Sequence, residues 1–286
     1  LGEGAFGKVW LAEDLALGRN IALKSVQPRG TERENEQVLG LLRSEARRMA
    51  EIRHPNVVGV LAWRIGAEGE HYLLLEFIPG GSLLDRVKAE GRLDWSSATR
   101  YIADVGEALE HVHHRAIVHR DIKPANILWD QRRDEAVLSD FGISARLASA
   151  RSSAPGPPPK GGRDNGLLIN DPSALDRTIA GTPAYMAPEA FDGEVSPALD
   201  VYSLAATLFH LVTAEIPFPA KRLNELRAMI RQGLPVPEPR FERIPEPLEQ
   251  LIRQALHHDP DQRPRLGEFA RALRVGLNQL LVDQLA

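Results

Sequence analysis

The feature that most constrains the fold is a change of apolar periodicity at Pro79-Gly80-Gly81. Before this point the apolar residues form short runs separated by turns, which is typical of strands. One longer amphipathic stretch over 38–52 is typical of a helix. The predicted strands cover 9–12, 21–24, 57–63 and 72–77. This part of the chain therefore predicts a small, mostly antiparallel sheet with one helix.

After Pro79-Gly80-Gly81 the apolar residues recur every three or four positions, as on the buried stripe of a helix. The clearest stripe follows Ser96 and comprises Ala98, Ile102, Val105, Leu109 and Val112. Further helices are predicted over 201–214, 248–257 and 267–284. Because 286 residues can bury a substantial core, we expect an α+β fold with a small β-rich lobe and a larger, mainly α-helical lobe.

Composition narrows the class of protein. The sequence contains no cysteine, which rules out disulfides and thiolate metal sites and favours a cytoplasmic location. Its 35 basic and 39 acidic residues give a net charge of -4, so the chain lacks the general positive charge that binds nucleic acid. The uncharged run 201–214 is shorter than the ~20 residues that a membrane-spanning helix needs. We expect neither a nucleic-acid partner nor a membrane segment in this chain.

Reactive groups are concentrated in the run from His119 to Asn126 and in Asp140-Phe141-Gly142, which follows it closely. Together these motifs supply a carboxylate base, a cation and two oxygen ligands of the kind that Mg²⁺ prefers. Transfer of a phosphoryl group needs these parts, because it depends on positioning and on stabilising charge on phosphate oxygens. In both motifs the chain resembles the eukaryotic-type serine/threonine protein kinase family. Its preference for arginine over lysine favours a bacterial source.

The resemblance implies a role for each residue of the two motifs. Asp121 would be the base that orients the substrate hydroxyl, and Lys123 would neutralise charge on the transferred phosphate. Asn126 and Asp140 would bind Mg²⁺, with Mn²⁺ as an alternative. His119 would be a buried structural histidine rather than a catalyst. Surface or turn roles would explain each residue alone, but their joint occurrence at this spacing favours catalysis.

Three glycines, Gly2, Gly4 and Gly7, open the chain. Dinucleotide-binding folds use the same spacing, but there the glycines lead into a helix, whereas residues 8–12 here continue as a strand. Glycines at a turn between strands let backbone amides approach phosphates without obstruction by side chains. The resemblance implies that this turn binds the phosphates of ATP.

Lys24 ends a predicted strand, where it could simply extend into solvent. Glu45, however, falls on the apolar stripe of the predicted helix, which also contains Leu41, Leu42, Met49 and Ile52. A carboxylate on that stripe needs a partner to offset its lost hydration, and Lys24 is the candidate. The resemblance implies that Lys24 contacts the α- and β-phosphates of ATP while it is paired with Glu45.

The resemblance also implies an adenine site. Leu75 would be the gatekeeper at the link between the lobes, and the backbones of Glu76 and Ile78 would contact the adenine edge. Ser82 would lie near the ribose. The adenine ring would lie between the side chains of Leu1, Val9, Ala22 and Leu128. Each of these apolar residues could equally be an ordinary core residue.

Residues 181–189 resemble the end of a kinase activation segment, where a peptide substrate docks. By the same resemblance Glu189 would pair with Arg263, and Asp200 would brace the catalytic loop. An aspartate at the start of a helix can also be a simple cap. Lys123 and Thr182 resemble the residues of kinases that phosphorylate serine or threonine. The expected partners are ATP and a protein substrate, and autophosphorylation is also expected.

The chain is expected to be a single protein kinase domain over 1–286, with the N-lobe at 1–78 and the C-lobe at 79–286. Because it begins inside the first strand, the start of the domain is expected to be truncated. Residues 148–177 are rich in proline, glycine and serine and predict a disordered insertion in the activation segment. Thr178 is predicted to be phosphorylated and to pair with Arg120.

Two other functions remain open. A pseudokinase scaffold would bind partners without catalysis, but it would have no need of Lys24, Glu45, Asp121, Asn126 and Asp140. A small-molecule phosphotransferase on a related fold would have no need of the docking motif 187–189 or of Arg263. His111 and His114 lie one helical turn apart, but no third ligand completes a zinc site, so a solvated helix face is the stronger interpretation.

Overall fold

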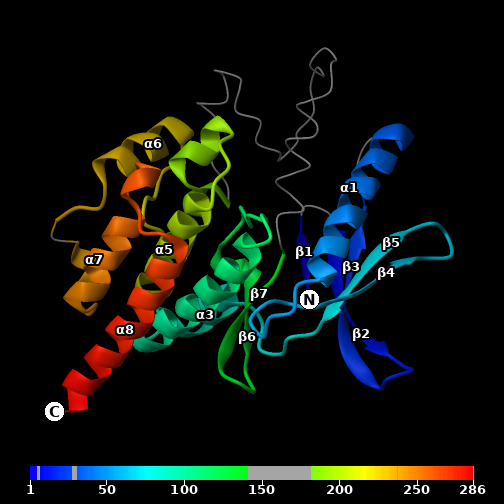
Figure 1. Ribbon diagram of the computed structural model, residues 1–286, viewed down its shortest axis with the longest axis horizontal. Helices are drawn as coiled ribbons and strands as arrows, with labels where there is room; N and C mark the ends of the chain where they lie inside the picture. The colour runs from blue at the N-terminus through cyan, green and yellow to red at the C-terminus, as the bar shows by residue number, and fades with distance from the viewer. Residues whose placement is uncertain (5–6, 28–30, 141–181, 237, 286) are drawn as a thin grey trace. The chain divides into compact units, whose positions relative to one another are not determined.

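The computed structural model describes residues 1–4, 7–27, 31–140, 182–236 and 238–285 of the chain. These residues form two compact units, one comprising 1–78 and the other beginning at Pro79 (Figure 1). The prediction of a small antiparallel sheet with one helix, followed by a mainly helical part, is confirmed. The predicted insertion at 148–177 and the predicted phosphorylation site Thr178 lie outside the described residues.

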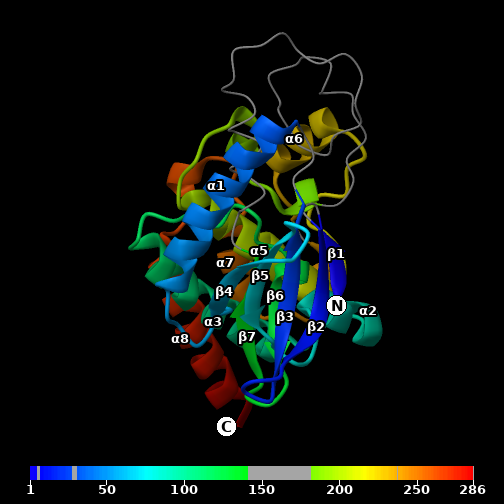
Figure 2. The ribbon, with the colours of Figure 1, turned by 90° about the vertical axis from the view of Figure 1, so that its right-hand side faces the viewer.

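The first unit is built on a five-stranded antiparallel sheet with the spatial order β1-β2-β3-β5-β4. One helix, α1 (Glu32–Ala50), packs on this sheet (Figure 2). Apolar residues of β3 and α1 form a small core, Val26, Val38 and Leu42, against which Leu39 and Trp63 pack. The strands are β1 (Gly2–Gly4), β2 (Gly7–Asp14), β3 (Arg19–Val26), β4 (Val60–Ile65) and β5 (His71–Glu76).

Two predicted boundaries in the first unit are wrong. The strand predicted from Val57 begins at Val60, because Val57 and Val58 are buried in the loop that follows the turn at 55–56, and an apolar run does not distinguish a buried loop from a strand. The predicted helix 38–52 is α1, which begins at Glu32 in a polar stretch without an apolar stripe. Leu41, predicted on the buried stripe of this helix, is 46% exposed.

The second unit is mainly helical. Helices α3 (Trp95–His113), α5 (Ala198–Thr213), α7 (Glu246–Ala255) and α8 (Leu266–Leu285) pack together, and the hairpin of β6 (Ile127–Asp130) and β7 (Glu135–Leu138) packs on α3. The predicted stripe of α3 is confirmed, since all five of its apolar residues are fully buried. None of the helices in the described part of the chain is long and apolar enough to cross a membrane.

Two further helices of the second unit were not predicted from the sequence. They are α2 (Leu83–Glu90) and α6 (Leu223–Gln232). Helix α2 has only 8 residues, so its apolar stripe repeats too few times to stand out. The cap of α2 was the available signal, because Ser82 and Asp85 form a reciprocal capping box at its start.

Helices α3 and α8 approach each other closely at Gly106, where a Cβ atom would lie 2.9 Å from the Cβ atom of Ala270. We expect the change Gly106→Ala to lower the free energy of unfolding by about 1–3 kcal/mol, because the two helices must separate to admit the methyl group. Urea denaturation followed by circular dichroism measures this change.

Gly276→Ala is the matched control on α8, since no atom lies within 4 Å of its Cβ position. Without a steric cost, alanine should stabilise the helix by up to about 1 kcal/mol relative to glycine. The two substitutions should therefore have opposite signs. Equal stabilisation by both would contradict the close helix contact at Gly106.

Candidate active site

The loop from His119 to Asn126 joins α3 to β6 in the second unit, and its start is held by Asp200 in the first turn of α5. The Asp200 side chain is 0% exposed. Its Oδ2 atom accepts a hydrogen bond from the His119 amide at 2.8 Å, and its Oδ1 atom accepts one from the Arg120 amide at 2.9 Å. The predicted bracing of this loop by Asp200 is confirmed.

Arg120 has a left-handed backbone conformation with φ of 68°. Such a conformation costs a residue with a side chain roughly 1–3 kcal/mol and persists only where the surroundings impose it. The hydrogen bond from the Arg120 amide to Asp200 supplies part of that constraint. The start of the loop is therefore held in a shape that the local sequence alone does not favour.

His119 is fully buried and connects the loop to the end of β7. Its Nδ1 atom accepts a hydrogen bond from the amide of Asp121 at 3.2 Å. Its Nε2 atom lies 3.0 Å from the carbonyl oxygen of Ser139, which can only accept, so Nε2 carries the proton. His119 thus has the buried, structural position that was predicted for it.

The predicted base, cation and amide ligand come together in this loop. The Nζ atom of Lys123 donates to both carboxylate oxygens of Asp121, at 2.9 and 2.8 Å. The Nδ2 atom of Asn126 donates to Oδ2 of the same carboxylate at 2.9 Å and to the Asp121 carbonyl at 2.7 Å. The Asp121 side chain remains 17% exposed, so its orientation is fixed while a substrate can still reach it.

Asp140 is separated from the end of β7 by Ser139 and is exposed. The residue before it is tied to the catalytic loop, because the amide and the hydroxyl of Ser139 both donate to the carbonyl of Asn126 at 2.9 Å. Since Nδ2 of Asn126 is bonded to Asp121, its Oδ1 atom is the part of the amide suited to a cation. This donor chemistry, one amide and one carboxylate oxygen, fits Mg²⁺.

The zinc alternative gains no support. No group of three or more histidines, cysteines, aspartates or glutamates in the described part of the chain could bind a metal ion. His111 instead contacts Arg115, whose Nη1 atom lies 2.8 Å from its Nε2 atom. Burial and this neighbouring positive charge lower the pKa of His111.

The three glycines belong to two paired strands of the first unit. Gly2 faces Val9, and Gly4 faces Gly7, in the antiparallel pairing of β1 with β2. The prediction that these glycines connect strands, rather than open a helix, is confirmed. In the next pairing Val9 faces Lys24, so the predicted phosphate-binding lysine lies beside the glycine-rich hairpin.

Glu45 is buried in α1, as predicted, with 8% of its surface exposed. Within the part of the chain that the structure describes, Glu45 makes no hydrogen bond or ion pair, so the predicted pair with Lys24 is not formed. The apolar stripe correctly predicted that this carboxylate points inward. It does not determine which cation lies opposite.

The residues predicted to contact adenine and ribose lie in both units. In the first unit, Ala22 is in the middle of β3, Leu75 and Glu76 end β5, and Leu1 is 69% exposed. The Glu76 amide donates to the Gly59 carbonyl at 2.9 Å, so a contact from its backbone to a ligand would use the Glu76 carbonyl. Ile78 is buried.

In the second unit, Leu128 of β6 forms an isolated bridge with Ser82. The Ser82 hydroxyl caps α2: it accepts from the Asp85 amide at 3.1 Å and donates to the Asp85 carboxylate at 2.6 Å. These bonds lower the pKa of Asp85. The contact of Ser82 with the ribose stays a prediction, and its hydroxyl already makes two hydrogen bonds with Asp85.

The predicted ion pair of Glu189 with Arg263 is confirmed. The two Nη atoms of Arg263 donate to the two carboxylate oxygens of Glu189 at 2.6 and 2.9 Å. The same guanidinium also donates to the carbonyls of His257, Ala198 and His258. Because the Arg263 side chain is 0% exposed, this pair ties the short helix Pro188–Asp192 to the start of α5 and to the loop after α7.

His113, at the end of α3, is a site residue that sequence reasoning missed. Its Nε2 atom lies 2.7 Å from Oδ2 of Asp200 and donates to it, because a carboxylate only accepts. Asp200 thus receives one side-chain and two backbone hydrogen bonds. The available signal was the spacing of four residues from Leu109, which places His113 on the buried face of α3.

We expect His113→Ala to lower kcat of the phosphoryl transfer proposed below by about tenfold or more with little change in KM for ATP. Loss of this bond leaves a buried oxygen of Asp200 with one donor fewer, so the catalytic loop shifts, and small shifts of a catalytic group are costly. In His113→Gln, the side-chain amide can donate to Asp200 and should restore part of kcat. Steady-state kinetics with ATP varied at saturating peptide separates these effects.

His114→Ala is the control, since His114 is the exposed neighbour of His113. It should leave kcat unchanged. If the alanine and glutamine variants of His113 had the same kcat, the hydrogen bond to Asp200 would not position the loop.

Comparisons with known proteins agree with this geometry. A sequence model of the protein kinase domain matches residues 1–273. CBL-interacting protein kinase 11 of Oryza sativa subsp. japonica is 32% identical over 278 residues, which cover 95% of this chain and 49% of that protein. Mitogen-activated protein kinase kinase kinase 3 of Homo sapiens is 34% identical over 222 residues, which cover 76% of this chain and 32% of that protein. The chain thus spans about half the length of these relatives or less.

The fold is also similar to that of a solved structure. The crystal structure of Rad53 1-466 in complex with AMP-PNP superimposes with a TM-score of 0.73 at 24% sequence identity. The similarity covers 95% of this chain and 62% of that chain. The predicted two-lobed fold class is therefore confirmed.

Proposed function

The chain belongs to the protein kinase domain family, as a relative of serine/threonine protein kinases, and on that premise we propose the reaction it performs. It transfers the γ-phosphoryl group of ATP to a serine or threonine hydroxyl of a protein substrate, and it also phosphorylates itself. The observation that carries this proposal is the Asp121 carboxylate, which is oriented by Lys123 and Asn126 on a loop braced by Asp200.

In this reaction a bond forms between the substrate hydroxyl oxygen and the γ-phosphorus, and the bond from that phosphorus to the β-phosphate oxygen breaks. Asp121 orients the hydroxyl and accepts its proton, while ADP leaves. Lys123 already contacts the Asp121 carboxylate, so its positive charge lies where negative charge develops on the transferred group.

Asn126 and Asp140 would bind Mg²⁺, which when bound neutralises charge on the phosphates of ATP. The glycine-rich hairpin and Lys24 would contact these phosphates, and Glu76 and Ile78 would contact the adenine. Loss of either metal ligand should therefore weaken the binding of the ATP–Mg²⁺ pair. The comparisons offer no support for a pseudokinase scaffold or for a small-molecule phosphotransferase.

A transfer assay tests the proposal. The purified chain is incubated with γ-labelled ATP, Mg²⁺ and a cell lysate, and the labelled residues are identified by mass spectrometry. Label on serine and threonine that is lost in Asp140→Ala supports the proposal. Absence of label from every protein, or wild-type labelling by Asp140→Ala, would contradict it.

A further inference from the structure

Two adjoining hollows in the second unit meet at the C-terminal end of α6. One, of about 190 Å³, is lined by Pro188, Glu189, Asp192, Arg227, Arg231 and His258. The other, of about 260 Å³, lies between α6 and the end of α7 and is lined in part by Leu234, Arg253 and His257. Because Arg231 and His258 line both, the two hollows form one continuous depression, which we call the α6 groove.

The carboxylates of the α6 groove are already paired. Glu189 is bound by the two Nη atoms of Arg263 at 2.6 and 2.9 Å. Asp192 accepts from Nη2 of Arg227 at 2.7 Å. These arginines cancel the negative charge that Glu189 and Asp192 would otherwise present to a ligand.

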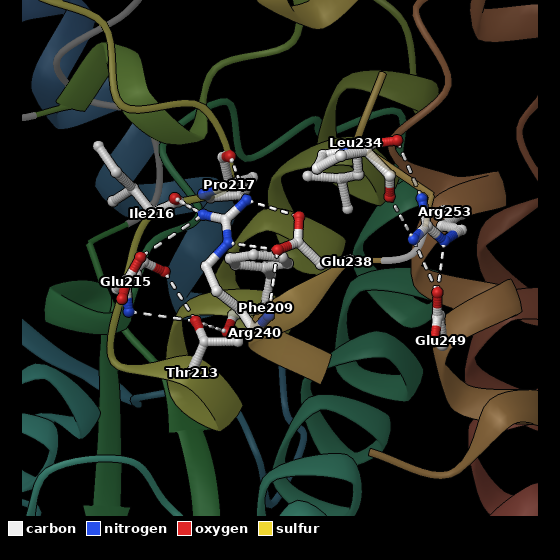
Figure 3. A network of polar contacts seen from close by, with 11 residues as sticks. Phe209, Thr213, Glu215, Ile216, Pro217, Leu234, Glu238, Arg240, Glu249 and Arg253 are labelled. Carbon is white, nitrogen blue, oxygen red and sulfur yellow. Dashed lines mark hydrogen bonds and ion pairs between the residues drawn. The ribbon is translucent and has the colours of Figure 1, made fainter. Parts of the chain in front are cut away.

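The same holds for the carboxylates next to the groove. Glu249 is bound by Arg253, which also donates to the Leu234 carbonyl at 3.0 Å, as Figure 3 shows. Figure 3 also shows Glu238 bound by Arg240, which lies over the ring of Phe209. Hydrogen bonding to Arg240 lowers the pKa of Glu238, so this acid stays ionised and paired. Glu238 and Glu249, on this side of the groove, are therefore both paired with arginines.

Arg231 differs from these arginines. It is exposed in the last turn of α6, and it makes no hydrogen bond or ion pair within the ranges that the structure describes. The rings of His257 and His258, which also line the groove, contact each other at a tilt of 31° with centroids 4.6 Å apart. Among the described residues, the groove thus offers one guanidinium without a carboxylate partner, beside two imidazoles.

We propose that the α6 groove binds an acidic segment of a protein partner through an ion pair between a glutamate or aspartate side chain and Arg231. A guanidinium matches a carboxylate in a two-bond geometry. A doubly charged phosphate is usually bound by a cluster of arginines, whereas the described residues give this groove a single arginine without a partner. We identify this partner as the protein substrate, because the groove begins at Pro188, next to the segment predicted to dock the peptide. This identification rests on the proposed function.

Binding is tested without ATP, by fluorescence anisotropy at low salt. The probes are a short labelled peptide that carries a cluster of glutamates, its glutamine analogue and its phosphoserine analogue. Arg231→Glu should weaken binding of the glutamate peptide about tenfold, because an attractive charge pair becomes a repulsive one. Arg271→Glu makes the same change of charge at an exposed position of α8 and should leave Kd unchanged.

The glutamine analogue should bind the wild-type chain about tenfold more weakly than the glutamate peptide. Arg231→Glu should reverse this preference, because its carboxylate repels the glutamates but not the neutral glutamines. Equal Kd values for the wild-type chain and Arg231→Glu would overturn the proposal. So would tight binding of the phosphoserine peptide with none of the glutamate peptide.

A transfer assay with a short peptide that lacks acidic residues separates this proposal from the proposed function. Arg231→Glu should retain wild-type transfer to that peptide. Transfer without binding of the glutamate peptide would refute the groove alone, whereas binding without transfer in any variant would refute the proposed function alone.

Discussion

Replacing Asp121 with asparagine is expected to lower kcat by roughly 10²- to 10⁴-fold, the usual contribution of a positioned general base. Asparagine has the same shape but cannot accept the proton of the attacking hydroxyl. It also removes the negative charge that binds Nζ of Lys123 at 2.8 Å. Because the loop is held mainly by Asp200 and His119, the fold should survive this change. Steady-state kinetics at saturating ATP and Mg²⁺ measures the loss.

The control for this prediction is Asp261→Asn, an exposed aspartate in the short helix Pro260–Gln262. It should leave kcat unchanged. KM for ATP should change little in Asp121→Asn, since this carboxylate acts on the hydroxyl rather than on the nucleotide. Wild-type kcat in a folded Asp121→Asn chain would show that another group is the base.

The elements that were predicted best from the sequence are the long helices, in which the spacing of the apolar residues matches the buried face. The α3 stripe, Ala98 to Val112, is fully buried, and the apolar run 201–214 falls in α5, which is buried along almost its whole length. In both cases the pattern repeats over several turns, so its period is unambiguous. Helix α6 is held in place by long-range contacts such as Arg227 with Asp192, which a local pattern does not reveal.

In the candidate active site, too, contacts between sequence neighbours were predicted and contacts between distant residues were missed. Asp121, Lys123 and Asn126 are neighbours in the sequence, so a single loop brings them together and a local motif predicts their contacts. His113 is 87 residues from Asp200, and no local pattern connects them. A buried polar group needs a hydrogen-bond partner, but its burial does not indicate which residue that partner is. The missing pair of Glu45 with Lys24 has the same cause.

The buried pair of Glu189 with Arg263 is expected to dominate the stability of the second unit. We expect Arg263→Ala to lower the free energy of unfolding by about 3–5 kcal/mol, because it leaves a carboxylate buried without its cation. It also removes donors from three backbone carbonyls. Arg263→Lys should lose less than this but still be destabilised, since an ammonium group cannot bind both oxygens in the fork geometry. Urea denaturation of each variant measures the effect.

The cause of the loss is separated by a double substitution. If the unpaired charge is responsible, Glu189→Gln combined with Arg263→Ala should be more stable than Arg263→Ala alone, because no buried charge then remains. Arg265→Ala, at an exposed position nearby, should change the free energy of unfolding by less than about 0.5 kcal/mol. Additive losses in the double variant would assign the effect to the carbonyl contacts of Arg263. The bond to Glu189 would then matter for the placement of the segment 188–192 and not for the stability of the fold.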